Sequence, residues 1–203
     1  QYGEDETQEL ARVLNTPAPL DVRVNTLKTK REEAFRVLEA VPVGCDVTPY
    51  AASGIRLHKK IALQNMPLFR DGGVEVQDEG SQLLAQIVGA KRGEMVVDFC
   101  AGAGGKTLAL GVAMRNTGRL YAFDVSERRL AKMKPRLARS GLSNVHPVQI
   151  AHERDARIKR LAGKADRVLV DSPCSGLGTL RRNPDLKWRQ TPDTIVEMAQ
   201  KQR

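Results

Sequence analysis

Aromatic residues and cysteines are scarce in this sequence. Only 4% of the 203 residues are aromatic, so aliphatic side chains must fill most of the core. The three cysteines include no Cys-x-x-Cys pair and the three histidines do not cluster with them, which argues against a disulfide framework and a metal site. No apolar run approaches the roughly 18 residues of a membrane span, and the acidic start lacks the pattern of a signal peptide. These absences predict a globular, cytoplasmic protein without metal and without membrane association.

Positive charge is unevenly placed along the chain. The net charge is +9, and residues 119–203 hold 19 Lys and Arg against 9 Asp and Glu, whereas residues 1–118 are nearly neutral. An excess of this kind favours an acidic partner such as nucleic acid at the C-terminal half. Charge alone leaves open the alternative that the basic residues only form a solvated face.

The turn Asp71-Gly72-Gly73 is the best candidate for a domain boundary. Before it, the residue pattern predicts a compact α+β unit with a helix over 31–40 and strands over 22–25, 45–50 and 54–58. We therefore expect a small α+β domain over residues 1–72 and a second domain over residues 73–203. The second domain should open with a helix over 79–88 whose apolar stripe comprises Leu83, Leu84, Ile87 and Val88.

Strands and helices alternate after that helix. The expected strands are short apolar runs over 95–100, 119–125, 145–150 and 167–171. The expected helices cover 106–114, the segment that Ser126 caps, 155–161 and 193–202. Pro135 should kink or end the helix that Ser126 caps. The alternation predicts an α/β fold with a mostly parallel, doubly wound sheet whose last strands are missing from these 203 residues.

A glycine-rich turn follows the first of these strands. The run from Cys100 to Thr107 contains Gly102, Gly104 and Gly105, which let the backbone approach a ligand at the start of the next helix. Asp124 ends the following strand, where an acid commonly accepts hydrogen bonds from the ribose of a cofactor. The turn lacks the glycine that a Walker A loop needs at position 100. Cofactors of the NAD type and the S-adenosylmethionine type both stay open, as does a turn without a ligand.

The segment from Asp166 to Asp185 carries a second candidate site. Asp171 and Cys174 end a parallel strand, on the edge where such sheets bind ligands. A free cysteine is more often a buried small hydrophobe. The neighbours of Cys174, which are Asp, Ser, Pro and Gly, fit that alternative poorly.

These motifs together resemble the Sun-type (Nop-related) RNA cytosine-5 methyltransferases. The matching segments span nearly the whole chain and are Arg23-Val24-Asn25-Thr26-Leu27-Lys28, Val76-Gln77-Asp78-Glu79-Gly80-Ser81, Val97–Thr107, Asp171-Ser172-Pro173-Cys174-Ser175-Gly176 and Arg181–Trp188. Two small residues depart from the family pattern, Ala103 in place of Pro and Ser172 in place of Ala. The resemblance implies a Rossmann-like methyltransferase core that uses S-adenosylmethionine, preceded by an RNA-guiding domain.

The resemblance also implies a mechanism with two cysteines. A thiolate adds to carbon 6 of a cytosine, carbon 5 takes the methyl group, and a second cysteine helps to release the enzyme. Cys174 resembles the release residue, and Asp171 resembles the carboxylate that touches cofactor and cytosine. The attacking cysteine belongs to a strand after Asp171, and no cysteine follows Cys174 here. We therefore expect these 203 residues to be inactive by themselves. Only Lys106 and Arg181 are candidates for a cation that activates the Cys174 thiol.

The remaining roles follow from the same resemblance. Asp124 should bind the ribose, Arg129 should flank the adenosine unless it is a solvated helix residue, and Asp155 should lie near the adenine. The other residues expected to contact the cofactor are Cys100, Ala101, Gly102, Ala103, Gly104, Gly105, Lys106 and Asp171. The expected partner is RNA, most typically bacterial ribosomal RNA, and the expected state is a monomer. Two alternatives are an inactive RNA-binding assembly factor and a DNA cytosine methyltransferase.

Overall fold

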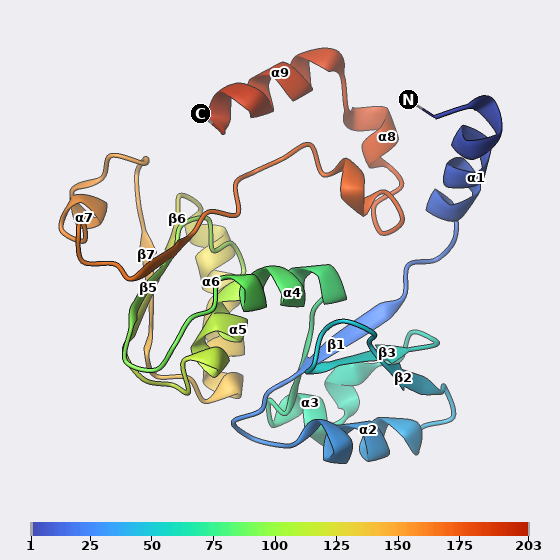
Figure 1. Cartoon of the computed structure of the whole chain (residues 1–203), viewed down its shortest axis with the longest axis horizontal. Helices are drawn as coiled ribbons and strands as arrows, with labels where there is room; N and C mark the ends of the chain where they lie inside the picture. Colours follow the sequence, from blue (N-terminus) through green and yellow to red (C-terminus); the bar gives the residue numbers. More distant parts are fainter. Residues whose placement is uncertain (1, 203) are drawn as a thin grey trace. The chain divides into compact units, whose positions relative to one another are not determined.

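The computed structural model describes residues 2–202 in two compact units. The larger unit consists of residues 20–171 and contains both β-sheets. The smaller unit consists of residues 2–19 together with residues 172–202 and is helical. Most of the helices and strands are labelled in Figure 1.

The first sheet of the larger unit is antiparallel. It comprises β1 (Leu20–Val24), β2 (Cys45–Val47), β3 (Gly54–Leu57) and β4 (Val74–Val76), in the order β2-β3-β1-β4. Helix α2 (Arg31–Glu39) packs on it through Ala34 and Leu38, and the short helices η1 (Leu63–Asn65) and α3 (Pro67–Arg70) precede β4. The strands and the helix expected before residue 60 are therefore present. Because β4 lies beyond Gly72 and pairs with β1, this sheet extends past the expected boundary, and the division at Gly72 stays a prediction.

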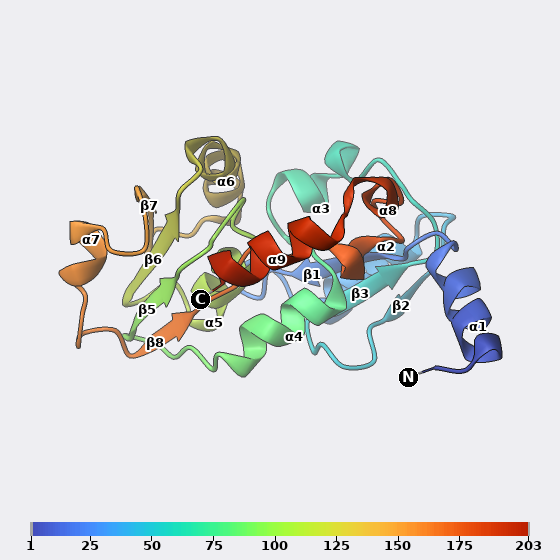
Figure 2. The same ribbon diagram turned by 90° about the horizontal axis from the view of Figure 1, so that it is seen from above.

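The second sheet is parallel throughout. It comprises β5 (Met95–Asp98), β6 (Arg119–Asp124), β7 (Val145–Gln149) and β8 (Arg167–Leu169), in the order β7-β6-β5-β8, as Figure 2 shows. Helices α4 (Glu79–Ile87), α5 (Gly105–Ala113), α6 (Glu127–Ser140) and α7 (Ala156–Lys159) alternate with the strands. The expected parallel α/β arrangement is confirmed. Its strands end at one common edge, which brings the turns after β5, β6 and β8 together.

The expected early end of α6 at Pro135 is wrong. The helix passes through Pro135 and runs on to Ser140, where Gly141 ends it in a left-handed conformation with φ of 77°. Pro135 has no N–H to donate to the carbonyl of Ala131. Both residues are exposed, so water can hydrate that carbonyl and the helix continues.

The expected apolar stripe of α4 is not its buried face. Gln82 and Ala85 are buried, whereas Ile87 is 80% exposed. The side-chain amide of Gln82 donates to the backbone oxygen of Gln77 at 2.9 Å. Ala85 packs with Val96 and Leu110, and Val88 of the expected stripe packs against the same cluster, so the buried face of α4 overlaps the expected stripe only at Val88.

Hydrogen bonds from two side chains, Asn25 and Lys28, to backbone carbonyls join the end of α6 to the segment that follows β1. Asn25 Nδ2 donates to the carbonyl oxygens of Gly72 and Ser140, both at 3.0 Å. Lys28 Nζ donates to the carbonyl oxygens of Asp71 at 2.7 Å and Arg139 at 2.8 Å. The two side chains therefore bond to carbonyls at the end of α6, which have no partner inside the helix. The joint is nearly filled, since it leaves a void of only about 10 Å³.

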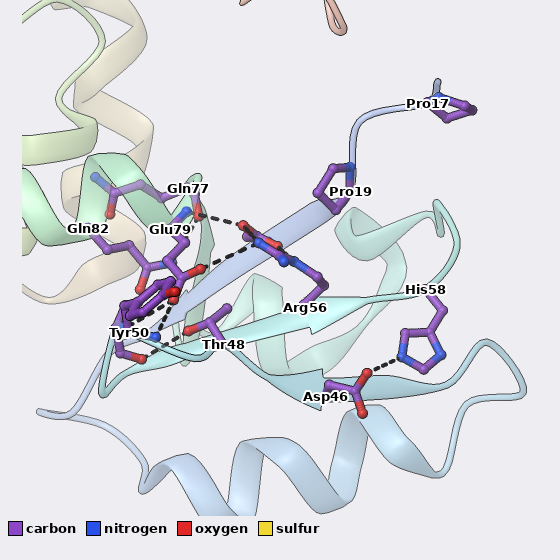
Figure 3. A network of polar contacts seen from close by, with 12 residues as sticks. Pro17, Pro19, Asp46, Thr48, Tyr50, Arg56, His58, Gln77, Glu79 and Gln82 are labelled. Atoms are coloured by element: carbon purple, nitrogen blue, oxygen red, sulfur yellow. Dashed lines mark hydrogen bonds and ion pairs between the residues drawn. The ribbon is translucent and has the colours of Figure 1, made fainter. Parts of the chain in front are cut away.

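A buried polar network fixes the start of α4 to the same sheet (Figure 3). Glu79 Oε1 accepts the backbone N–H groups of Tyr50 at 2.6 Å and Ala51 at 3.0 Å. Asp21 accepts a bidentate pair of bonds from Arg56, at 2.7 and 2.9 Å, together with the N–H of Glu79 at 3.1 Å. The carboxylates of Asp21 and Glu79 thereby tie one loop, one strand and one helix together.

The smaller unit contains α1 (Glu4–Leu14), η2 (Leu177–Thr179), α8 (Leu186–Arg189) and α9 (Pro192–Lys201). The guanidinium group of Arg181 donates to Thr16 Oγ1 at 2.8 Å and to the carbonyl oxygen of Pro17 at 2.9 Å. Arg182 donates to the carbonyl oxygen of Pro19 at 2.9 Å. Two arginines of the Arg181–Trp188 motif thus hold the segment that follows α1. Of the helices within residues 2–202, none combines the length and the apolar character that crossing a membrane requires.

We predict that Glu79→Ala lowers the free energy of unfolding by about 2 to 4 kcal/mol, because it leaves the backbone N–H groups of Tyr50 and Ala51 without their acceptor and removes one of the two carboxylates that pair with Arg56. Urea denaturation measures the effect. Glu32→Ala, which removes an exposed acid of α2, is the control and should stay within about 0.5 kcal/mol of the original chain. Equal stabilities of the two variants would contradict the role given to Glu79.

Candidate functional site

The glycine-rich turn lies at the carboxyl edge of the parallel sheet. Phe99 N–H donates to the carbonyl oxygen of Leu169 at 2.8 Å, and Ala101 N–H donates to that of Phe123 at 2.9 Å. These bonds fix the turn between the ends of β8 and β6. Gly102 and Gly104 have φ angles of 57° and 86°, in the left-handed region that glycine tolerates. A Cβ at position 104 would lie 2.5 Å from Met133, so the packing against α6 also requires glycine there.

Asp98, which ends β5 below this turn, is a residue that the sequence analysis did not single out. Its carboxylate is buried, and its Oδ2 accepts the hydroxyl of Thr107 at 2.6 Å, while Oδ1 has no protein partner. Burial raises the pKa of Asp98 to about 6, although the Thr107 hydrogen bond acts in the opposite direction. An acid that ends an apolar strand just before a glycine-rich turn is the sequence signal that could have found it.

Asp124 is buried at the end of β6 and binds the turn directly. Its Oδ2 accepts the N–H of Gly102 at 2.8 Å, and its Oδ1 accepts the N–H of Ser126 at 2.8 Å. Arg129 approaches Oδ1 to 2.9 Å, so Arg129 is an ion-pair partner of Asp124 rather than a purely solvated residue. The structure therefore brings together Asp124, Arg129 and the turn, as a cofactor site at this edge requires.

Asp155 caps the short helix α7. Its carboxylate accepts the N–H groups of Ala151 and Arg157, at 3.1 and 2.9 Å, and pairs with the Arg157 guanidinium at 2.7 Å. These bonds, above all those from Arg157, hold the pKa of Asp155 well below its usual range. The carboxylate lies close to the end of β7 and is ionised, but its oxygens already have protein donors.

Lys106 and Asp171 form an ion pair across the edge of the sheet. Lys106 Nζ lies 2.7 Å from Asp171 Oδ2, and the lysine side chain is 16% exposed whereas that of Asp171 is 46% exposed. The pair joins the first turn of α5 to the segment after β8. Lys106 thus pairs with the carboxylate of Asp171, whereas the alternative was that it only caps nearby backbone carbonyls.

The three cysteines differ in their surroundings. Cys174 is exposed and belongs to the smaller unit, where Arg181 donates to the segment 16–17 and is engaged there. Burial raises the pKa of the Cys45 and Cys100 thiols, and the carboxylates of Asp124 and Asp98 raise that of Cys100 further. Both of these thiols are therefore protonated at neutral pH, which does not suit a nucleophile.

Many basic residues of the C-terminal half have partners inside the protein. Glu75 of β4 pairs with Arg139 at 2.6 Å and with Arg136 at 3.3 Å, and Glu94 pairs with Arg167 at 2.8 Å. On α6, Arg128, Lys132 and Lys134 are exposed, and Arg129 is also exposed but pairs with Asp124. The net charge of this half consequently overstates the basic surface that is available to a partner.

Two further features were not expected from the sequence. Arg136 donates to the carbonyl oxygen of Ala103 at 2.6 Å, inside the glycine-rich turn. A cavity of about 380 Å³ lies beside Tyr121, Phe123 and Arg160, and none of the expected site residues lines it. Among residues 2–202, no three His, Cys, Asp or Glu side chains gather closely enough to hold a metal ion.

Comparison with known proteins finds two matching families that together cover most of the chain. Residues 85–203 match the family described as 16S rRNA methyltransferase RsmB/F. Residues 1–64 match the ferredoxin-like domain of RsmF/B-like methyltransferases. A curated relative, the probable ribosomal RNA small subunit methyltransferase B of Synechocystis, is 37% identical over 198 residues. That match covers 97% of this chain but only 44% of the relative, so the chain spans less than half of its length.

Two solved structures share the fold. A methyltransferase homologue from Pyrococcus horikoshii aligns with a TM-score of 0.78 at 33% identity and covers 92% of this chain and 61% of its own. The structure of NSun6 from Pyrococcus horikoshii with SFG aligns with a TM-score of 0.86 and covers 99% of this chain and 74% of its own. At 22% identity, the second match establishes likeness of fold only.

We predict that the Asp98 carboxyl titrates with a midpoint of about pH 6, because burial disfavours its charge. Thr107→Val should raise this midpoint, since it removes a hydroxyl that stabilises the carboxylate. Carbon-detected NMR titration of Asp98 measures both values.

The raised pKa of Asp98 also makes the stability of the protein depend on pH. The pKa of Asp98 in the folded state lies above its ordinary value of 3.8, so its contribution to the free energy of unfolding is present at low pH and declines as the pH rises from about 4 to about 6. Asp98→Asn should abolish this decline. A carboxyl that titrates near pH 4 would contradict the assignment.

Proposed function

Because the chain belongs to the 16S rRNA methyltransferase RsmB/F family, we propose that it forms the cofactor-binding part of an enzyme that methylates carbon 5 of a cytosine in ribosomal RNA. The resemblance found in the sequence is thereby confirmed at the level of the family. The Rossmann-like fold and the dependence on S-adenosylmethionine agree with it. The activity proposed is that of the whole protein, of which these residues are a part.

One observation carries the proposal for the cofactor. The glycine-rich turn between β5 and α5 is bonded through the N–H of Gly102 to Asp124, the acid at the end of the adjacent strand β6. One edge of the sheet thus holds a glycine turn that a ligand can approach closely, the start of α5 and the buried acceptor Asp124. A nucleoside cofactor requires this combination.

The residues of this edge fit S-adenosylmethionine. The turn from Cys100 to Lys106 would contact the methionine part, and Asp124 would accept the ribose hydroxyls in place of its bond from Arg129. Asp155 would accept a hydrogen bond from the adenine only if it gave up one of its present bonds, such as those from the N–H groups of Ala151 and Arg157. Asp171, which is held by Lys106, would lie at the reacting end. The bound cofactor supplies the methyl group, and these residues orient it and exclude water.

Cys174 fits the release step better than the attack. It is exposed, and Arg181, a candidate for its activating cation, is engaged with Thr16 and Pro17 within the same unit. Attack on carbon 6 requires a second cysteine, and none follows Cys174 in the 203 residues. We therefore infer that this chain alone forms no covalent bond with RNA.

The RNA substrate is proposed from the family and from the basic surface. A cytosine has to leave the base stack before carbon 6 can be attacked. The exposed residues Arg128, Lys132 and Lys134 of α6 are suited to contact phosphates, whereas Arg129 and Arg136 bind carboxylates and backbone of the protein itself.

We predict that the 203-residue chain binds S-adenosylmethionine and that Asp124→Ala weakens this binding by about 10- to 100-fold, as expected for the loss of hydrogen bonds to a buried charge. Titration calorimetry measures both affinities. Asp46→Ala, an exposed acid of β2, is the matched control and should bind like the original chain. Unchanged affinity in Asp124→Ala would rule out its role toward the ribose.

We predict that Cys174→Ala in the full-length enzyme accumulates a covalent protein–RNA adduct, because carbon 6 is still attacked but the enzyme is not released. Denaturing electrophoresis with labelled ribosomal RNA detects the adduct. Cys45→Ala is the control, since that thiol is buried in the first sheet, and it should accumulate none. If Cys174→Ala forms no adduct while a variant of the second cysteine does, Cys174 is the attacking residue.

A further inference from the structure

Arg136 of α6 connects the first sheet with the glycine-rich turn. Its Nη1 donates to the carbonyl oxygen of Ala103 at 2.6 Å, and its Nη2 lies 3.3 Å from Oε1 of Glu75 on β4. Glu75 itself touches no residue of the turn in these contacts. We propose that Glu75 is a positioning residue, which orients Arg136 and thereby sets the shape of the turn that receives the cofactor.

The surroundings of Glu75 explain why its charge matters. Its side chain is only 12% exposed and pairs with Arg139 at 2.6 Å as well as with Arg136. Arg23 of β1 is buried nearby, where desolvation lowers its pKa to about 10 while Glu75 raises it. Arg23 is therefore still charged at neutral pH. One carboxylate thus compensates three guanidinium groups, and its removal would leave them to repel one another.

A side chain from outside the turn holds it at Ala103. The left-handed residues Gly102 and Gly104 flank Ala103, and their N–H groups are held by Asp124 and by the carbonyl oxygen of Ala101, whereas the carbonyl oxygen of Ala103 is held by Arg136. On the other side, Arg129 restrains Gly102 indirectly, since it pairs with the Asp124 carboxylate that accepts the Gly102 N–H. Arg129 and Arg136 are seven residues apart on one face of α6 and so hold consecutive residues of the turn.

The consequence for binding is preorganisation. A turn that is fixed before the cofactor arrives loses less conformational freedom on binding than a mobile one. The first sheet thereby acts on cofactor affinity through Glu75 and Arg136, without contacting the cofactor. This inference rests on the proposed role of the turn as the cofactor site.

The test compares Glu75→Gln with Arg139→Gln in the 203-residue chain. Glu75→Gln removes the charge that orients Arg136, whereas Arg139→Gln removes the other ion pair of Glu75 and the contact with Phe69 but leaves Arg136 on Ala103. Hydrogen exchange of residues 100–106 reports on the turn, and calorimetry with S-adenosylmethionine reports on binding. We expect Glu75→Gln to raise both the exchange rate and the dissociation constant at least about fivefold, and Arg139→Gln to change each less than about twofold.

A second variant, Arg136→Lys, tests the inference in case Glu75→Gln does not fold. Arg136→Lys keeps a positive charge beside Glu75, but its single nitrogen cannot span both partners, so the turn should loosen in the same way. Equal loosening by Glu75→Gln and Arg139→Gln, or none by Glu75→Gln and Arg136→Lys, would overturn the inference. If the original chain does not bind S-adenosylmethionine while the two variants still loosen the turn, the proposed function fails and the positioning role stands.

Discussion

Three carboxylates share one edge of the parallel sheet, and each of them needs a separate source of compensation. Asp98 and Asp124 are the last residues of β5 and β6 and Asp171 follows β8, and because these strands are parallel the fold brings the three charges to one edge. Asp124 is compensated by two N–H groups and Arg129, and Asp171 by Lys106. Asp98 receives only the hydroxyl of Thr107, and its raised pKa follows from that difference and from its burial. The N–H groups, Arg129, Lys106 and Thr107 that bind these three carboxylates therefore form much of the proposed cofactor site.

The N-terminal motifs that resemble the family act mainly as internal contacts. Arg23 donates to Gln77 at 2.7 Å, Asn25 and Lys28 bind carbonyls at the end of α6, and Glu79 holds the backbone at residues 50 and 51. The contacts of Asn25, Lys28 and Glu79 join the part of the chain that contains the first sheet to α6 and α4, whereas the bond from Arg23 joins β1 to the segment between β4 and α4. These motif residues therefore have contacts inside the protein, and a further pair of residues, Glu75 and Arg136, connects the first sheet with the proposed site.

Local patterns predicted the strands and the turn well, because apolar runs, caps and glycines act over a few residues. Ser126 caps α6 as expected, with its Oγ accepting the N–H of Arg129 at 3.3 Å. The buried face of α4 was missed in part, because the small residue Ala85 packs in the core whereas the larger Leu84 and Ile87 are exposed. The partners of Arg136 were missed because Glu75 and Ala103 are far from it in sequence. Long-range polar contacts leave no periodic signal in a single sequence.

The same contacts change what the net charge of the C-terminal half means. Several of its arginines bind other groups of the protein. Acidic side chains pair with four of them, Arg129, Arg136, Arg139 and Arg167. Arg181 donates to a backbone carbonyl of the smaller unit. A guanidinium group suits this work because its planar donors can hold a carboxylate and a carbonyl at once, as Arg136 does. Lysines carry no such fork, and Lys132 and Lys134 are exposed on α6. The case for nucleic acid binding thus rests on a smaller set of residues than the sequence suggests, among them Arg128, Lys132 and Lys134 of α6.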